Sequence, residues 1–318
     1  MRARSRVVIV TPYGRAANNG NWHTAARWAR LLAEDCSVAV VTRWTPRIDA
    51  DVLIALHARR SAESIAAFAE QHPGRRLVVV LTGTDLYRDI ATDASAQRSL
   101  DLATQLVVLN AVGHERLPDK LRRKTVYIPQ SARALAPGRK VQRLFDVAIV
   151  GHLRDEKNPQ LVWAVAAQLP PDARIRLWHA GAARQPGLAS DARRVMRTHA
   201  HYHWLGDLPR AQARQLMRRC HLLLHPSRME GGAQAVIEAV TAHTPVLASR
   251  IDGNVGLLGR DYPAYFDDDD ADQAAALLLS AAAEPRLLAR WTRAADKAAR
   301  QFDPALEARR VRALVNAR

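Results

Sequence analysis

Cysteines and aromatic residues are scarce in this sequence. Two cysteines, Cys36 and Cys220, occur among 318 residues, far apart and inside apolar segments. Because small secreted folds depend on several disulfides, this scarcity argues against a disulfide framework and predicts a reducing compartment. Phe, Trp and Tyr together make up 5% of the residues. No basic cluster is interleaved with them in the manner of proteins that stack single-stranded nucleic acid.

Long apolar runs are also missing. Val7–Val10 is too short for the core of a secretion signal, and Thr11 and Pro12 follow it at once. No run approaches the ~20 apolar residues that a membrane span requires. We therefore expect a cytoplasmic protein without a membrane span.

Acidic residues are the minority among the charged ones. Lys and Arg number 47 against 31 Asp and Glu, which gives a net charge of +16. Three explanations compete: attraction of small anionic substrates, attachment to nucleic acid or an anionic membrane surface, and a coding bias toward Ala and Arg. Because no basic cluster is interleaved with aromatic residues, we favour coding bias combined with attraction of small anionic substrates. We expect no nucleic-acid partner.

The residues that are present repeat a pattern of short apolar runs, glycine-containing turns and amphipathic stretches. Hydrophobic residues make up 48% and charged residues 25% of the chain. This alternation is typical of an α/β fold built on parallel strands. The expected strands are Arg6–Val10, Val38–Val41, Val52–Leu56, Leu77–Leu81, Leu106–Leu109, Thr125–Ile128, Leu144–Val150, Ile175–His179, Leu222–Leu224 and the run after Pro245.

The chain length suits two domains of about 150 residues, each large enough to bury its own sheet. Pro129–Gly138 contains two prolines and a glycine, which indicates a linker. We expect an N-terminal domain over residues 1–135, a C-terminal domain over 136–300 and a final segment over 301–318.

The stretch His221–Ser249 combines strand, glycine turn, helix and strand. Paired glycines allow a tight turn, so the free amides of the following helix can face an anion such as a diphosphate. Two glutamates can flank one crevice at the carboxyl edge of the sheet, where ionised oxygens suit sugar hydroxyls. The alternative is an ordinary βαβ unit with two surface glutamates. The residues concerned are Glu230, Gly231, Gly232, Ala233 and Glu238.

The loop after the first strand is rich in Asn and Gly. These residues tolerate positive φ and leave backbone amides exposed, so they can build an anion-binding nest. A solvent-exposed turn is the alternative. The candidate residues are Asn18, Asn19, Gly20 and Asn21, followed by an expected helix over Trp22–Ala33.

Polar residues also follow two other strands of the first domain. His57 comes directly after Val52–Leu56, and Thr84 and Asp85 follow Leu77–Leu81. Ligands meet an open α/β sheet at such strand ends. His57 is a candidate base or phosphate contact, and Thr84 and Asp85 are candidates to orient an acceptor. A capping Asp and a His that closes a strand end are the alternatives.

Basic residues gather near two sheet edges. Arg88, with Arg59 and Arg60, places positive charge at the rim of the first domain. In the second domain His152, Arg154 and Lys157 lie in the turn between a strand and the helix Gln160–Leu169. Strand, glycine, basic turn and helix together describe a phosphate-facing edge.

Three further groups of polar residues have more than one possible role. His199, His201 and His203 alternate and could share a strand face, but no Cys or carboxylate at ligand spacing accompanies them, so we expect no metal. Asp267–Asp270 is expected to cap the next helix, with a cation site as the alternative. Asp252–Asn254 is expected to form a strand-end turn that closes over a ligand.

The run Pro226-Ser227-x-x-Glu230-Gly231, followed by Glu238-Ala239 and Pro245-Val246, resembles the donor-site signature of retaining nucleotide-sugar glycosyltransferases, glycosyltransferase family 4. The resemblance implies the GT-B fold, in which two Rossmann-like domains face each other across a cleft. It also implies that the final segment packs back toward the first domain. It implies a UDP-sugar co-substrate with protein cations in place of a metal cofactor.

The same resemblance implies residue roles. The second glutamate of the signature holds the ribose, and the first lies beside the transferred sugar. Gly151–Lys157 resembles the family's Gly-Arg-Leu-x-x-x-Lys motif, whose cations neutralise the leaving diphosphate, with His152 at the Arg position and Arg154 as a substitute. His243 stands where the family has a helix-ending Gly, so it is expected in the left-handed region. The implied catalytic residues are Glu230, Lys157 and Arg154, and the donor-binding residues are Glu238, Gly231, Gly232, Ala233, Gly20, His152 and Gly253.

A narrower resemblance covers nearly the whole chain. The segments Asn18–Trp22, Gly83–Asp89, Gly151–Arg154 and His225–Gly232 look like those of the selenosugar synthases of bacterial selenoneine biosynthesis. This implies transfer of a sugar, typically N-acetylglucosamine, from a UDP-sugar to selenophosphate, with release of UDP and phosphate and hand-over to other selenoneine pathway enzymes. A glycosyltransferase for a hydroxyl acceptor and a non-catalytic basic nucleic-acid or membrane-surface binder are the alternatives. The implied acceptor-binding residues are Asn18, Asn19, Asn21, Thr84, Asp85, Arg88 and His57.

Overall fold

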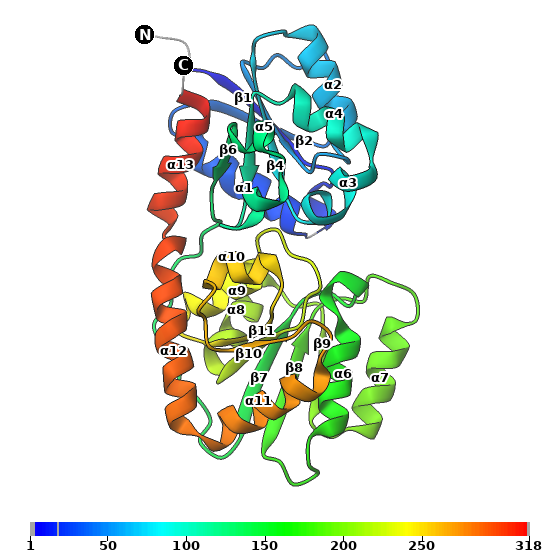
Figure 1. Cartoon of the computed structure of the whole chain (residues 1–318), viewed down its shortest axis with the longest axis vertical. Coiled ribbons are helices and arrows are strands. Elements are labelled where there is room, and N and C mark those ends of the chain that lie inside the picture. Colours follow the sequence, from blue (N-terminus) through cyan, green and yellow to red (C-terminus); the bar gives the residue numbers. More distant parts are fainter. Residues whose placement is uncertain (1–3, 18, 317–318) are drawn as a thin grey trace. The chain divides into compact units, whose positions relative to one another are not determined.

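A computed structural model describes residues 4–17 and 19–316 and divides the chain into two compact units (Figure 1). The first unit comprises the chain up to Gln130 together with the part from Pro304 onward, and the second comprises Ser131–Asp303. These limits lie a few residues from the domain limits at 135 and 300 expected from the sequence. Within the described residues, no helix is long and apolar enough to cross a membrane.

The first unit is built on a parallel sheet in the order β2-β1-β3-β4-β5-β6. Its strands are continuous Val, Ile and Leu runs, as expected for parallel strands covered on both faces. The strands are β1 (Arg6–Val10), β2 (Ser37–Val41), β3 (Val52–Leu56), β4 (Arg76–Leu81), β5 (Gln105–Val108) and β6 (Thr125–Tyr127). The α-helices are α1 (Gly20–Leu32), α2 (Ala62–Gln71), α3 (Ile90–Thr92), α4 (Ala94–Leu102), α5 (Asp119–Arg122) and α13 (Pro304–Asn316). The unit also has two 3-10 helices, η1 (Arg15–Ala17) and η3 (Gly113–Arg116), and a π-helix, η2 (Asp85–Asp89).

Each face of this sheet has its own apolar core. Val7 and Ile9 of β1 pack with Trp28 of α1 on one face, whereas Val8 packs with Phe68 of α2 on the other. Successive residues of a strand point to opposite faces, so one strand supplies both cores. Helices α1 and α13 therefore cover one face, and α2 and α4 cover the other.

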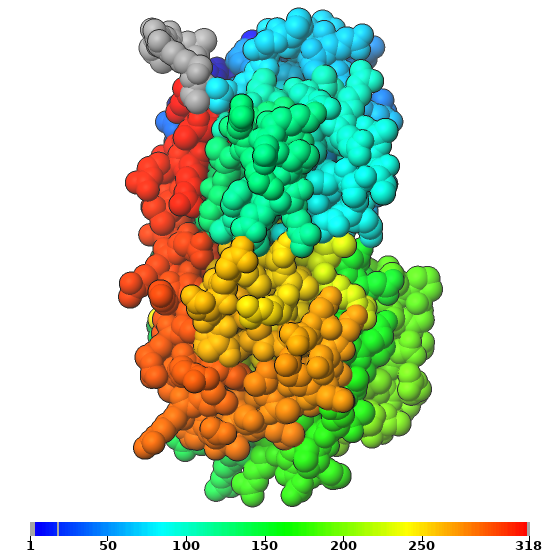
Figure 2. Space-filling view, in the orientation of Figure 1, coloured from blue at the N-terminus to red at the C-terminus, as the bar shows by residue number. Residues whose placement is uncertain are grey.

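The second unit repeats this plan with a parallel sheet in the order β12-β11-β10-β7-β8-β9. In Figure 2 the helices α11 and α12, in orange, form part of its surface. Its strands are β7 (Phe145–Val150), β8 (Ile175–Ala180), β9 (Tyr202–Gly206), β10 (Leu222–His225), β11 (Val246–Ser249) and β12 (Tyr265–Phe266). Its helices are α6 (Pro159–Gln168), α7 (Leu188–Thr198), α8 (Arg210–Arg219), α9 (Gln234–Val240), α10 (Asp252–Leu258), α11 (Ala271–Ala283) and α12 (Pro285–Ala299), with turns η4 (Asp155–Lys157) and η5 (Arg300–Phe302).

Local expectations for the second unit have mixed outcomes. Helix α9 ends at Val240 with Thr241 as its C-cap, and His243, in the turn that follows, takes the expected left-handed conformation at φ 57°. Asp270 caps α11 by accepting a hydrogen bond from the Gln273 amide, also as expected. The turn expected over Asp252–Asn254 is wrong, because these residues form the first turn of α10. The preceding Ile251 is extended, so the helix begins immediately after a short connection from β11.

Helix α13 is joined to α1 by a buried charged cluster. The guanidinium Nε of Arg27 donates to both carboxylate oxygens of Glu307 at 3.0 and 2.9 Å, and Trp28 Nε1 donates to Glu307 Oε1 at 2.8 Å. The Glu307 side chain is 1% exposed and that of Arg27 is 9% exposed. Removing one partner of a buried ion pair leaves the other charge buried with neither a counter-charge nor water around it, which destabilises the fold.

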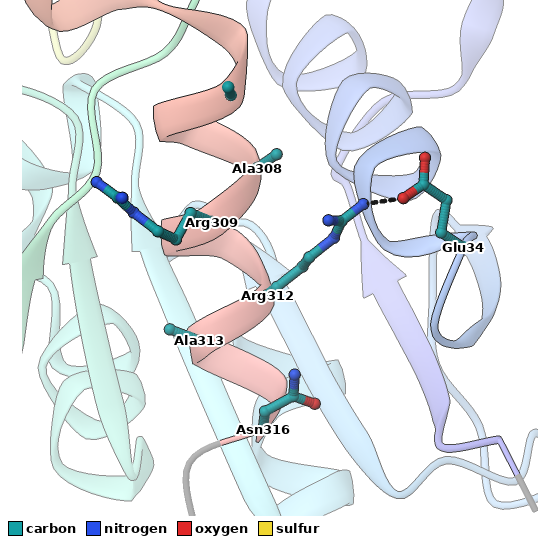
Figure 3. Close-up of a pocket in the computed structure, with 7 residues that line it drawn as sticks. Glu34, Ala308, Arg309, Arg312, Ala313 and Asn316 are labelled. Atoms are coloured by element: carbon teal, nitrogen blue, oxygen red, sulfur yellow. Dashed lines mark hydrogen bonds and ion pairs between the residues drawn. The ribbon is translucent and has the colours of Figure 1, made fainter.

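Replacing Glu307 with Gln is therefore expected to lower the free energy of unfolding of the first unit by about 3 kcal/mol. Urea titration monitored by circular dichroism measures this change. Glu34→Gln is the matched control, because Arg312 of α13 reaches Glu34 at the surface beside a depression lined by Ala308 and Ala313 (Figure 3). An exposed pair contributes less than about 1 kcal/mol. Equal effects of the two substitutions would contradict a buried-charge origin.

Candidate active site

Loops from neighbouring strands meet at the carboxyl edge of the second unit's sheet. Strand β10 leads into the turn that carries Glu230, and its neighbour β7 leads into the turn that carries Lys157. Because adjacent parallel strands end at the same edge, both side chains are delivered to one place. Lys157 Nζ donates to Glu230 Oε1, so the structure brings together these two candidate catalytic residues.

Glu230 lies in a buried and positively charged environment. Its side chain is 8% exposed, and His225 Nε2 lies 3.2 Å from Oε1, although without hydrogen-bond geometry. Burial alone raises the pKa of Glu230, but Lys157 and His225 outweigh it and hold that pKa well below its usual range. The carboxylate is therefore ionised at neutral pH. Burial lowers the pKa of His225.

Gly253 fixes the backbone of Glu230 from the opposite side. A Cβ atom at Gly253 would lie 2.1 Å from the Glu230 carbonyl oxygen and 2.7 Å from its Cβ. No side chain fits between α10 and this turn. Gly253 therefore sets the position of Glu230. This structural role differs from the expected one, in which Gly253 belongs to a turn that closes over a ligand.

Replacing Gly253 with Ala is expected to lower kcat/KM of a reaction at this site roughly a hundredfold, because the Glu230 turn has to move by about 1 Å. Steady-state kinetics measures the loss. Gly14→Ala is the control, since its added Cβ would meet Thr42 at an ordinary 3.8 Å. Unchanged kinetics in Gly253→Ala would show that the Glu230 turn tolerates displacement.

A second set of contacts ties the Lys157 turn to the Glu230 turn. Asn158, at φ 50°, caps α6 and donates to Asp269 Oδ1 at 2.6 Å. Arg228 donates to both oxygens of Asp269 at 3.0 Å, and its backbone amide donates to Glu156. Asp269 thus links Asn158, which follows Lys157, to Arg228, which lies two residues before Glu230. The acidic run that contains it was expected only to cap a helix or bind a cation.

The other basic residues of the β7 loop have separate surroundings. His152 Nδ1 accepts a hydrogen bond from the Ala182 amide at 3.1 Å, which leaves the ring proton on Nε2. Arg154 is 43% exposed, and its Nε lies 3.9 Å from Glu156 Oε2, beyond hydrogen-bond distance. No hydrogen bond or ion pair within the described residues joins Arg154 to Glu230.

Glu238 lies on α9, which begins at Gln234 directly after Gly231, Gly232 and Ala233. Its side chain is 5% exposed and is paired with Arg210 of α8, whose Nε donates to Oε1 at 2.6 Å. Sequence reasoning missed Arg210, because 28 residues separate the partners and no motif contains both.

In the first unit, the Asn-rich loop ends as the cap of α1. Asn19 accepts a hydrogen bond from the Trp22 amide, and Gly20 and Asn21 form the first turn. The helix therefore begins two positions before the expected Trp22, because Asn19 supplies the capping oxygen. A Cβ at Gly20 would meet nothing within 4 Å. The candidate Asn18 lies outside the described residues.

Asp85 is fully buried and organises its own loop. Its Oδ1 accepts from the amides of Thr82 and Gly83 at 2.8 and 2.9 Å, and its Oδ2 accepts from the Ala58 amide at 3.0 Å. Both oxygens are thus engaged by the backbone. We therefore leave Asp85 out of the proposed acceptor contacts, since it holds the loop that carries Thr84.

His57 is also engaged at both ring nitrogens. It takes a positive φ of 76°, which is uncommon for a residue other than glycine and is frequent at functional sites. Its Nδ1 accepts from the Arg60 amide at 3.3 Å, so the proton lies on Nε2, which donates to Thr84 Oγ1 at 3.0 Å. This arrangement orients the Thr84 hydroxyl and engages both ring nitrogens of His57 in hydrogen bonds.

Arg88 and Arg59 share one buried carboxylate. Arg59 Nε donates to Asp89 Oδ2 at 2.8 Å, and Arg88 Nε donates to Oδ1 at 3.2 Å. Burial alone raises the pKa of Asp89, but the two guanidinium groups outweigh it and lower that pKa. Asp89 therefore holds two partly exposed cations side by side at the sheet edge, a contribution that the sequence did not indicate.

The alternating histidines point to different partners. His201 contacts the carbonyl oxygens of Ile175 and Pro170 at 3.0 Å each, whereas His203 stacks on Trp178 with ring centroids 4.5 Å apart. In the part of the chain that the structure describes, no three His, Cys, Asp or Glu side chains are placed to hold a metal ion.

Comparison with known sequences identifies the family of the second unit. The sequence profile described as Glycosyl transferases group 1 matches residues 133–298, just over half of the chain. The chain belongs to this family. The glycosyl transferases group 1 match includes the candidate residues Lys157, Glu230 and Glu238. A search of curated protein sequences gave no match.

Solved structures show the fold of this glycosyl transferases group 1 member. Anabaena Alr3699/HepE in complex with UDP-glucose has a TM-score of 0.76 and 14% identity, with 99% of this chain and 100% of that chain covered. Sucrose-phosphate synthase from Thermosynechococcus elongatus has a TM-score of 0.76 and 15% identity, covering 98% of each. S. aureus TarM has a TM-score of 0.68 and 14% identity over 84% of this chain and 55% of TarM, so this chain spans just over half of TarM. The expected GT-B fold with two Rossmann-like domains is confirmed.

Proposed function

We propose that this protein is a UDP-sugar-dependent glycosyltransferase and, more narrowly, a selenosugar synthase that transfers N-acetylglucosamine to selenophosphate. The observation that carries the proposal is the pairing of half-buried Lys157 with buried Glu230 at the sheet edge. It lies in a chain whose family and fold are those of glycosyltransferases. HepE, a structural neighbour, binds UDP-glucose, which supports a UDP-sugar as donor.

The donor chemistry follows from the charges of the second unit. Breaking the bond between the sugar and UDP builds negative charge on the diphosphate. Lys157 supplies a half-buried cation, and the glycine turn before α9 presents backbone amides to the same edge. Glu238 accepts from a ribose hydroxyl, and Glu230 lies beside the sugar. His152 and Arg154 add positive charge from the β7 loop.

The acceptor chemistry uses the first unit. Selenophosphate is a small anion with several negative charges, and such a group needs converging cations and amide donors. Arg88 stands beside Arg59 at the sheet edge, Thr84 presents an oriented hydroxyl, and the capped start of α1 carries Asn19 and Asn21. Asn18 belongs to the same proposed loop by its sequence position.

The proposed reaction needs no general base. The selenium lone pair forms the bond to the anomeric carbon while the carbon–oxygen bond to UDP breaks. Water then cleaves the selenium–phosphorus bond, which gives the selenosugar and phosphate. An anionic nucleophile requires no proton removal, which agrees with the two occupied ring nitrogens of His57.

Incubation of the full chain with UDP-N-acetylglucosamine and selenophosphate under anaerobic conditions, followed by mass spectrometry, tests the proposal. We expect a selenosugar together with equimolar UDP, and no product from Glu238→Ala. Turnover of a hydroxyl acceptor without any selenosugar would replace the narrow assignment with a lipid or glycan glycosyltransferase. Binding of nucleic acid or anionic vesicles at physiological salt without UDP binding would indicate a non-catalytic protein.

A further inference from the structure

Glu238 is held by Arg210 in an end-on arrangement. Arg210 Nε and Nη2 lie 2.6 and 2.5 Å from the same oxygen, Oε1, and Gln234 Nε2 lies 3.3 Å from it. Three donors therefore converge on one oxygen of a carboxylate that is 5% exposed. Within the described residues, no hydrogen bond reaches Oε2.

The same domain shows what a purely structural pair looks like. Arg176 Nε donates to Asp146 Oδ1 at 2.7 Å, and its Nη2 donates to Oδ2 at 2.9 Å. That fork occupies both carboxylate oxygens, which is the geometry usually preferred by arginine. Arg210 has the same guanidinium but occupies one oxygen of Glu238. The second oxygen keeps its capacity to accept a hydrogen bond from a ligand.

The helices that carry the pair place it at the carboxyl edge of the sheet. Arg210 is the first residue of α8, which follows β9, and Glu238 lies on α9, which follows β10 and the glycine turn. Arg214, one turn further along α8, donates to the Arg133 carbonyl oxygen. Arg210 is therefore the α8 guanidinium that fixes the rotamer of Glu238, and its side chain is 35% exposed.

We propose that Arg210 is a positioning and specificity-determining residue, which saturates Oε1 of Glu238 so that Oε2 accepts a hydrogen bond from a ribose hydroxyl of the nucleotide. This inference rests on the proposed function. It assigns to Arg210 the selection of ribonucleotides over deoxyribonucleotides. Without the guanidinium, Glu238 is free to rotate, and its preference for a hydroxyl at one position is lost.

Isothermal titration calorimetry of the full chain with UDP, 2′-deoxyUDP and 3′-deoxyUDP tests the inference. A hydrogen bond to a charged group corresponds to about a tenfold to hundredfold change in affinity. We expect the wild type to discriminate by that factor against one deoxy analogue. In Arg210→Met the ratio should fall to about threefold or less, and in Arg210→Lys, which keeps the charge with a single nitrogen, it should be intermediate.

Arg218→Met is the matched control, because it removes the same charge from the same helix but from a guanidinium that donates to the Ala136 carbonyl oxygen. It should keep the wild-type ratio. UDP binding with an unchanged ratio in Arg210→Met overturns the role of Arg210 and leaves the proposed function standing. Failure of the wild type to bind UDP overturns both. Arg210→Lys gives the same decision if Arg210→Met does not fold.

Discussion

Replacing Lys157 with Met lowers the turnover number for sugar transfer roughly a hundredfold to a thousandfold, as expected for loss of a group that stabilises charge in the transition state. Lys157 is 19% exposed and contacts Glu230 at the sheet edge. The leaving diphosphate gains charge as the sugar bond breaks, so a nearby cation stabilises the transition state more than the bound substrate. Quench-flow or steady-state assays of UDP release measure the loss.

Lys297→Met is the control for Lys157→Met. Lys297 lies in the last turn of α12 and belongs to neither the β7 nor the β10 loop, so its removal should change turnover by less than twofold. A Lys157→Met enzyme with normal turnover but a raised KM would assign the lysine to ground-state binding. Normal values of both constants would remove it from the site.

Replacing Glu230 with Gln is expected to lower turnover about a hundredfold, because the charge beside the transferred sugar is lost while the side-chain shape is kept. The neutral amide no longer offsets Lys157, so the attraction between Lys157 and the bound diphosphate grows in the ground state. KM should therefore fall or stay constant while kcat falls. A proportionate rise in KM would contradict a role in the transition state.

The stability of the wild type and that of Glu230→Gln should also depend differently on pH. Lys157 and His225 offset burial and hold the pKa of Glu230 below its unfolded value, so ionised Glu230 stabilises the fold above an unfolded pKa of about 4.3. This stabilisation is lost as pH falls below that value. We expect the difference in unfolding free energy between wild type and Glu230→Gln to shrink from pH 6 to pH 3. Urea midpoints at both pH values measure it, and a constant difference would contradict the ionised pair.

The sequence predicts the parallel α/β architecture and several loops of the site because those features are local. Apolar runs such as Val52–Leu56 become buried strands, and the paired glycines after Glu230 become the turn before α9. The strand, glycine and basic-turn pattern singled out Lys157 from one segment. Its contact with Glu230 depends on β7 and β10 being neighbours in the sheet, which the sequence did not indicate, because parallel strands share an edge only once their order is known.

The remaining parts of the site depend on contacts between distant segments. Arg210 of α8 pairs with Glu238 of α9, and Asp269 accepts hydrogen bonds from both Arg228 and Asn158. The spacing of residues in the sequence does not predict such contacts between distant segments. Asp85 shows a second reason why site residues are hard to predict from the sequence. A polar residue at a strand end can accept hydrogen bonds from the backbone amides of its own loop instead of binding a ligand.

A crystal structure of the protein with UDP tests the central claim most directly. The account predicts the diphosphate within hydrogen-bond distance of Lys157 Nζ, and a ribose hydroxyl on Oε2 of Glu238 with Arg210 still on Oε1. UDP bound away from the carboxyl edge of the second sheet, with Lys157 and Glu238 untouched, would contradict it.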